Sequence, residues 1–102
     1  GQYYDCGNLE SVSFMFMNLA SLVNMQKNHQ QALEYLNAGL EIADSLGLLS
    51  QLRQGYRNLS ETYAYMGDYE NAYINHLTYI TYKDSIFNIE KAASFQELNI
   101  LN

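Results

Sequence analysis

The chain repeats a sequence pattern at a spacing of 40 residues. Asn18-Leu19 recurs as Asn58-Leu59, and Ala32 recurs as Ala72. Internal similarity at a period of about 20 to 50 residues is typical of stacked helix hairpins. Because one hairpin buries only one of its faces, it needs a neighbour to cover the other. The repeat therefore predicts two similar helix hairpins that pack side by side, with an apolar face left over at the end of the stack.

The composition favours a single all-α domain. With 102 residues, of which 48% are hydrophobic, the chain suits one domain that buries a core. Proline, which interrupts helices, is absent, so the sequence allows long helices. Cys6 is the one cysteine, which excludes a disulfide within the chain.

The charge and hydropathy of the chain argue against two classes of partner. Its net charge is −6, with five lysines and arginines, and this provides no positive field to attract a phosphate backbone. We therefore expect no nucleic acid partner. No stretch reaches the roughly 20 apolar residues that cross a bilayer, so we expect no membrane contact by this chain. Gly1 stands where an initiating Met would, and we expect an excerpt from a longer protein.

Apolar spacing predicts four helices. The first runs from about residue 8 to 25, the second begins near Asn28 and ends at Gly47, and the third covers about 50–66. Asn28 and Gln31 have the spacing of a capping box at the start of the second helix. The predicted inward residues of the first three helices are Leu9, Val12, Phe16, Leu19, Ala20, Val23, Ala32, Leu33, Leu36, Leu40, Ala43, Leu52, Tyr56, Leu59, Ser60 and Tyr63.

The fourth helix should follow Gly67 and be capped by Asp68. Its predicted inward residues are Ala72, Tyr73, His76, Tyr79 and Ile80. After Tyr82 the apolar residues recur every third position, which one straight helix cannot keep on one face. We therefore expect a break or bend near Asp84 or Asn88, or burial on several sides.

These residues resemble the tetratricopeptide repeat. The second copy matches that family at Tyr56, Leu59, Ser60, Tyr63, Gly67, Tyr69 and Ala72. The first copy matches at Phe16, Leu19, Ala20, Val23, His29, Ala32, Leu36 and Gly39, with Lys27 replacing the usual glycine. The resemblance implies a right-handed α-α superhelix with repeats over about 9–47 and 50–86 and a C-terminal capping helix over about 88–101.

The same resemblance implies a groove that binds a peptide or a partner protein. The positions that line the groove in this family correspond to Phe14, Met17, Ser21, Asn24, Gln54, Arg57, Glu61 and Ala64, with Tyr65 and Met25 at its edge. Phe14 to Met17 are four large apolar residues in a row, and they must cover more than one side of a helix. Two alternatives remain open: a spacer that pairs with its own copy through the exposed end, and a small-ligand or enzymatic domain.

The segment from Tyr82 to Ala92 resembles the end of the repeat array in bacterial membrane-bound sensors. That resemblance implies a periplasmic location and a signalling role, with a cytoplasmic location as the alternative.

No catalytic motif is present, and we expect neither an enzyme nor a cofactor. His29 and His76 lack a second ligand at helical spacing, so no metal site is expected. Most of the ten tyrosines have repeat-core roles, while Tyr3, Tyr4 and Tyr65 are left over.

Overall fold

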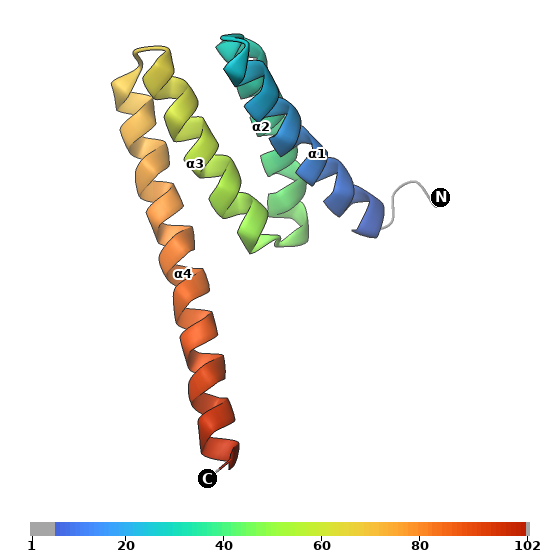
Figure 1. Cartoon of the computed structure of the whole chain (residues 1–102), viewed down its shortest axis with the longest axis vertical. Helices are drawn as coiled ribbons and strands as arrows, with labels where there is room; N and C mark the ends of the chain where they lie inside the picture. The colour runs from blue at the N-terminus through green and yellow to red at the C-terminus, as the bar shows by residue number, and fades with distance from the viewer. Residues whose placement is uncertain (1–5, 102) are drawn as a thin grey trace.

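The computed structural model describes residues 6–101, and it describes side chains for residues 8–94. This part of the chain forms four helices: α1 (Cys6–Met25), α2 (His29–Leu46), α3 (Leu49–Tyr65) and α4 (Tyr69–Leu101). Helices α1 and α2 form one antiparallel hairpin, α3 and α4 form the next, and α2 lies against α3 (Figure 1). The prediction of an all-α stack of helix hairpins is confirmed. Tyr3, Tyr4 and the thiol of Cys6 lie outside the described part.

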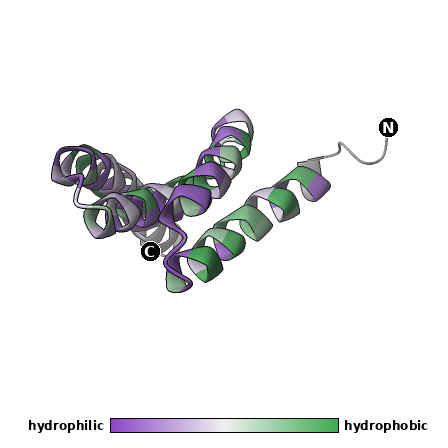
Figure 2. Ribbon diagram, turned by 90° about the horizontal axis from the view of Figure 1, so that it is seen from above, coloured by the Kyte–Doolittle hydropathy of each residue, from purple (hydrophilic) through white to green (hydrophobic). Residues whose placement is uncertain are grey.

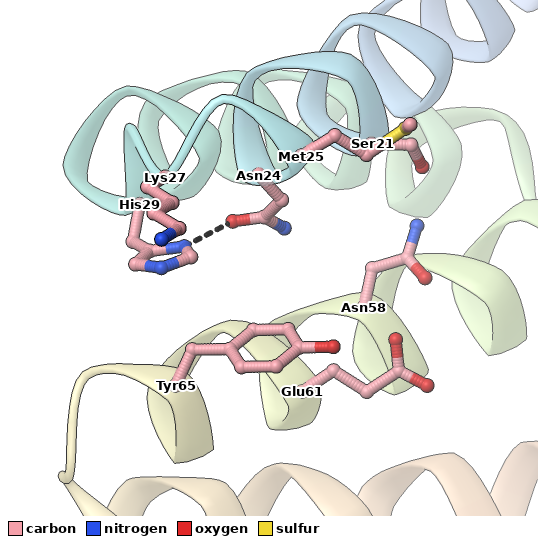
Figure 3. A pocket seen from close by; sticks show the side chains of 8 residues that line it. All are labelled: Ser21, Asn24, Met25, Lys27, His29, Asn58, Glu61 and Tyr65. Carbon is pink, nitrogen blue, oxygen red and sulfur yellow. Dashed lines mark hydrogen bonds between the residues drawn. The ribbon is translucent and has the colours of Figure 1, made fainter.

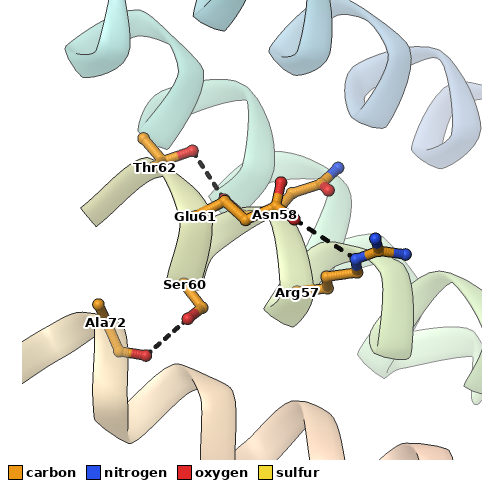
Figure 4. Close-up of polar contacts among 6 residues, drawn as sticks. All are labelled: Arg57, Asn58, Ser60, Glu61, Thr62 and Ala72. Atoms are coloured by element: carbon orange, nitrogen blue, oxygen red, sulfur yellow. Dashed lines mark hydrogen bonds and ion pairs between the residues drawn. The ribbon is translucent and has the colours of Figure 1, made fainter. Parts of the chain in front are cut away.

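The core lies between the two hairpins and is centred on α2. The residues that were predicted to point inward from α2 are all buried, namely Ala32, Leu33, Leu36, Leu40 and Ala43. Small residues let the helices of each hairpin approach closely: Ala20 and Ala32 are both 0% exposed. In the second hairpin, the Ser60 hydroxyl donates to the Ala72 carbonyl at 2.7 Å (Figure 4). The repeated small residues therefore mark the contact between the two helices of a hairpin.

Two glycines end helices in the left-handed conformation. Gly47 has φ 67° and follows α2, and Gly67 has φ 81° and follows α3. Both ends match the predictions, because glycine has no Cβ to oppose this conformation. Lys27 occupies the position 40 residues before Gly67 and also has a positive φ, 63°. A lysine thus takes the conformation that the second copy gives to glycine.

The two predicted helix caps differ in outcome. The Asp68 carboxylate accepts a hydrogen bond from the Asn71 backbone N–H at 3.3 Å, so the predicted cap of α4 is confirmed. The predicted capping box of α2 is wrong. The Asn28 N–H already donates to the Val23 carbonyl at 2.8 Å, and the Asn28 side chain donates to the Gln31 amide oxygen at 2.9 Å. Neither of the two hydrogen bonds of a capping box can therefore form.

This difference predicts unequal effects of two cap substitutions. Asp68→Ala should lower the free energy of unfolding by about 1 kcal/mol, because it leaves an N–H group of the first turn without its partner. Asn28→Ala should change that free energy by less than about 0.5 kcal/mol, since the exposed Asn28 side chain caps nothing. Urea denaturation followed by circular dichroism measures both. Equal losses would contradict the assignment of the two caps.

Helix α4 departs from the prediction over its second half. It is continuous from Tyr69 to Leu101, so the expected break near Asp84 or Asn88 is absent and the separate capping helix over 88–101 is wrong. Figure 1 shows α4 running well past the N-terminal end of α3. The side chains of residues 87–94 are all exposed, so the alternative of burial on several sides is wrong for this stretch, and Phe95, Leu98 and Leu101 lie outside the described side chains.

The predicted inward face of α4 is only partly buried. Ala72 is buried and Ile80 is half-buried, but Tyr73 is 63% exposed and His76 is also exposed. The reason is that α4 packs on α3 and on no other helix, whereas α2 packs on both α1 and α3. No helix in the described part of the chain has the length and apolar character that a membrane span requires.

Helix α1 also presents apolar side chains to solvent. Phe14 is 59% exposed and Met25 is 81% exposed, while Met17 is buried at 3%. Figure 2, which colours residues by hydropathy, shows apolar residues along much of α1. The prediction that the run from Phe14 to Met17 covers more than one side of its helix is confirmed.

Candidate functional site

Helices α1 and α3 border a cavity near their C-terminal ends. The cavity has a volume of about 450 Å³. Its lining residues come from α1, the turn after it, the start of α2, and α3, and Figure 3 draws them: Ser21, Asn24, Met25, Lys27, His29, Asn58, Glu61 and Tyr65. We call it the upper cavity.

A second cavity of about 510 Å³ lies between the N-terminal parts of α1 and α3. Its lining residues are Glu10, Phe14, Met17, Asn18, Ser21, Ser50, Gln51, Arg53 and Gln54. We call it the lower cavity. Because Ser21 lines both, the two cavities adjoin, and together they form one groove along α1 and α3.

A hydrogen-bond chain fixes one wall of the upper cavity. The Asn24 side-chain amide donates to the Thr62 hydroxyl at 2.7 Å, and the Thr62 hydroxyl donates to the backbone carbonyl of Asn58 at 2.7 Å. His29 Nδ1 lies 2.8 Å from Asn24 Oδ1, and because that oxygen can only accept, Nδ1 is the donor. The His29 ring stacks on Tyr65 at 5.3 Å between centroids and 15° between planes. The wall is thus held in place by contacts between α1, α2 and α3.

Asn58 has an unsatisfied side-chain donor at this cavity. The residue is 8% exposed, and its amide nitrogen has no hydrogen-bond partner among the described residues. Figure 3 shows the Asn58 amide directed from α3 into the space beside α1. A buried donor without a partner costs about 1 to 3 kcal/mol. That nitrogen is itself buried, so a carbonyl or carboxylate oxygen of a ligand reaches it, and removes that cost, once the Asn58 side chain turns toward the cavity.

Charges of both signs border the upper cavity. Arg57 Nε lies 3.4 Å from Glu61 Oε1, with side chains 58% and 52% exposed, so the pair adds little stability (Figure 4). Glu61 can therefore exchange this partner for a ligand at small cost. Lys27 lies on the opposite side of the cavity opening. Among the described residues, no three His, Cys, Asp or Glu side chains gather closely enough to hold a metal ion.

Comparison with known proteins assigns the chain to a family. The family model described as "Tetratricopeptide repeat" matches residues 11–74, which is more than half of the chain. The chain belongs to the tetratricopeptide repeat family. Neither the comparison with curated proteins nor the comparison with solved structures gave a significant match. Tetratricopeptide repeats generally mediate interactions between proteins, and they typically act as scaffolds without catalysis.

Most of the residues predicted to line the groove do line one of the two cavities between α1 and α3. Ser21, Asn24, Glu61 and Tyr65 line the upper cavity, and Phe14, Met17, Ser21 and Gln54 line the lower one. Arg57 and Ala64 line neither cavity, although both are exposed. That these residues bind a partner stays a prediction.

Met17 was expected to line the groove, but its side chain is buried. It is 3% exposed, and its Cε lies against Gly39 of α2 and Gly55 of α3, so it forms the floor of the lower cavity. The two repeat helices can surround Met17 because neither glycine has a side chain. Its contribution is therefore mainly to the core.

Sequence reasoning missed Asn58 and His29 as groove residues. In the sequence, Asn58 stands out only as part of the repeat pattern, and His29 only as a position that matches the family. A helical signal was available for Asn58, because Gln54, Asn58, Glu61 and Tyr65 follow the i, i+4, i+7, i+11 spacing of one face. No sequence signal indicated that the Asn58 amide would lack a partner.

Proposed function

We propose that this tetratricopeptide repeat domain binds an extended segment of a partner protein in the groove between α1 and α3, without catalysis. The observation that carries the proposal is the unsatisfied Asn58 amide at the upper cavity. A peptide backbone offers a carbonyl oxygen at every residue, so it suits a single fixed donor of this kind. The groove also adjoins exposed apolar side chains, which is typical of a protein-binding surface.

Four side chains have separate roles in this proposal. Asn58 turns its amide toward the cavity and donates to a carbonyl of the peptide, and Glu61 accepts from a peptide N–H. The exposed Tyr65 ring, which His29 holds by stacking, provides a flat apolar surface for a ligand side chain. At the other end, Phe14 adds apolar area beside the lower cavity. Polar groups thus set the register of the peptide and apolar groups supply the burial.

The test begins with selection of binders from a displayed library of unstructured peptides. Calorimetry then compares the native domain with Asn58→Leu and Tyr65→Ala. Each substitution should weaken binding of a selected peptide by about tenfold, which corresponds to one lost hydrogen bond or aromatic contact. Asn37→Ala is the control, because Asn37 is exposed on α2 and lines neither cavity.

Stability separates a binding role of Asn58 from a structural one. Asn58→Leu removes an unpaired buried donor, so the free energy of unfolding should stay the same or rise. A loss of stability would mean that the amide supports the fold. Selected peptides that bind the native domain and both variants equally would exclude the groove, and failure to select any peptide would favour a spacer with an empty groove.

The sensor role and the periplasmic location are further parts of the proposal. Their support is the resemblance of the segment from Tyr82 to Ala92 to the end of the repeat array in bacterial membrane-bound sensors. The sequence of the parent gene tests this directly. A membrane-spanning segment with a kinase or DNA-binding part after the repeats would support it, and a reading frame without them would leave the cytoplasmic alternative.

A further inference from the structure

Three side chains of the lower cavity each favour contact with an aromatic ring. Phe14 and Met17 are three positions apart on α1, so they share a face of that helix, and Arg53 reaches the cavity from α3. Aromatic rings attract one another, methionine sulfur contacts the edges of rings, and a guanidinium group binds over a ring face. The walls and the floor of this cavity therefore offer different contacts to the same kind of ligand group.

The Phe14 ring is open to a partner. It is 59% exposed, and it makes no ring contact with another of the described residues. Phe14 also lines a third cavity of about 290 Å³, which shares Glu10 and Gln51 with the lower cavity. The Tyr65 ring of the upper cavity differs, because His29 already stacks on it. Of these two groove rings, Phe14 is thus the one without a ring partner.

The backbone and the floor around the Phe14 ring are already held in place. The buried Ser13 hydroxyl, next to Phe14 in sequence, donates to the Gly39 carbonyl of α2 at 2.9 Å. Met17 is 3% exposed, and its Cε lies against Gly39 and Gly55. An apolar cavity of about 150 Å³ is large enough for benzene. The lower cavity has about 510 Å³, so it can take an aromatic side chain without a rearrangement of the core.

The charges of the lower cavity favour a neutral group. Glu10 comes from α1 and Arg53 from α3, and among the described residues neither is in an ion pair. A carboxylate would be attracted by Arg53 and repelled by Glu10, and an ammonium group would meet the reverse. An aromatic ring is neutral, but its face is negative and its edge positive, so it can present its face to Arg53 and its edge to Glu10. An aliphatic side chain fills the space without either contact.

We propose that the lower cavity selects an aromatic side chain of the bound peptide through Phe14, Met17 and Arg53. This inference rests on the proposed function, which supplies a peptide held in the groove. Ser21 lines both cavities, so one extended segment can lie along both. The partner segment therefore carries a phenylalanine, tyrosine or tryptophan where it passes the lower cavity, while its backbone meets the polar groups of the upper cavity.

Peptides selected by the native domain from a displayed library of unstructured peptides should share an aromatic residue at one position. Calorimetry then compares a selected peptide with versions that carry cyclohexylalanine or alanine there. Cyclohexylalanine keeps the size of the ring and removes its π electrons, so it should weaken binding about threefold to tenfold. Alanine should weaken it by more than about tenfold. Equal affinity for the aromatic and cyclohexylalanine peptides, or selection of acidic residues instead, would overturn the proposal.

Two substitutions in the domain assign the preference to the lower cavity. Phe14→Ala should weaken binding of the aromatic peptide about tenfold, and Arg53→Gln about threefold. Arg53→Gln should leave binding of the cyclohexylalanine peptide unchanged, because that ring has no negative face for a cation. Met15→Ala is the matched control, since Met15 is the next residue of α1, is 47% exposed and lines none of the three cavities. Equal effects of Phe14→Ala and Met15→Ala would overturn the assignment.

The same measurements separate this inference from the proposed function. A selected peptide that is weakened by Asn58→Leu and Tyr65→Ala, but not by Phe14→Ala, would keep the groove and remove the aromatic pocket. Titration with N-acetyltryptophan amide, followed by amide NMR shifts, probes the pocket without any selected peptide. The shifts should gather around the lower cavity, shrink in Phe14→Ala and exceed those from N-acetylleucine amide. Equal shifts from the two probes would overturn the aromatic selection, whereas the expected shifts without any selectable peptide would keep the pocket and remove the peptide function.

Discussion

Replacing Leu36 with alanine is expected to lower the free energy of unfolding by about 2 to 5 kcal/mol. Leu36 is 0% exposed and is among the largest fully buried side chains of the described residues. Leu36 lies on α2, the helix that contacts both α1 and α3. The cavity that Leu36→Ala creates would therefore lie where the two hairpins meet. Because such a domain is stable by only about 5 to 15 kcal/mol, this loss is a large fraction of the total. Urea denaturation of the native and substituted chains measures it.

The matched control for this prediction is Leu22→Ala. Leu22 is 50% exposed on α1, so its removal opens no enclosed cavity, and leucine and alanine both favour a helix. The free energy of unfolding should change by less than about 0.5 kcal/mol. Similar losses for Leu36→Ala and Leu22→Ala would contradict the position of the core at the junction of the hairpins.

Gly55→Ala is expected to lower the free energy of unfolding by about 1 to 2 kcal/mol, although it adds a better helix former. Alanine in place of glycine inside a helix usually contributes about 1 kcal/mol of stability. Here an added Cβ would lie 2.8 Å from Leu40 Cγ, closer still to Leu40 Cδ2, and 3.0 Å from Met17 Cε. Overpacking of a buried site typically costs about 1 to 3 kcal/mol. Because Leu40 and Met17 are themselves buried, neither can move away freely, and the clash outweighs the gain.

A second background decides whether Leu40 is the cause. In the Leu40→Ala chain the opposing side chain is gone, so adding Gly55→Ala should no longer destabilise and should raise the free energy of unfolding by up to about 1 kcal/mol. Urea denaturation of the four chains gives this double-mutant cycle. An unchanged penalty in the Leu40→Ala background would mean that the loss has another origin than the contact between α2 and α3.

Several features of the fold could be predicted because they depend on neighbours in sequence. Gly47 and Gly67 end helices, and Asp68 caps one, because a turn needs a residue that tolerates its backbone angles and donors at a helix start need an acceptor. Ala32 and Ala72 are buried as the repeat predicts. Within the groove, Ser21, Asn24 and Glu61 lie where the family resemblance implied.

The failures concern features that depend on what lies beside a helix in space. Tyr73 has the counterpart position of the buried Leu33, yet it is 63% exposed because α3 is the one helix among the described residues that packs on α4. The Asn28–Gln31 cap failed because the Val23 carbonyl had already taken the Asn28 N–H. The break expected near Asp84 is absent. Apolar residues that rotate around a helix require a break only where all of them must be buried on one side.

Two helix hairpins with defined ends can be predicted from the sequence, because helix period, caps and left-handed turns are set by residues within a few positions of each other. Packing between the helices, in contrast, makes Met17 a core residue between two glycines, and among the described residues it leaves the Asn58 amide without a partner and one face of α4 uncovered. Burial and hydrogen-bond satisfaction depend on residues about 20 to 40 positions away, and a repeat pattern does not specify which of those contacts are made.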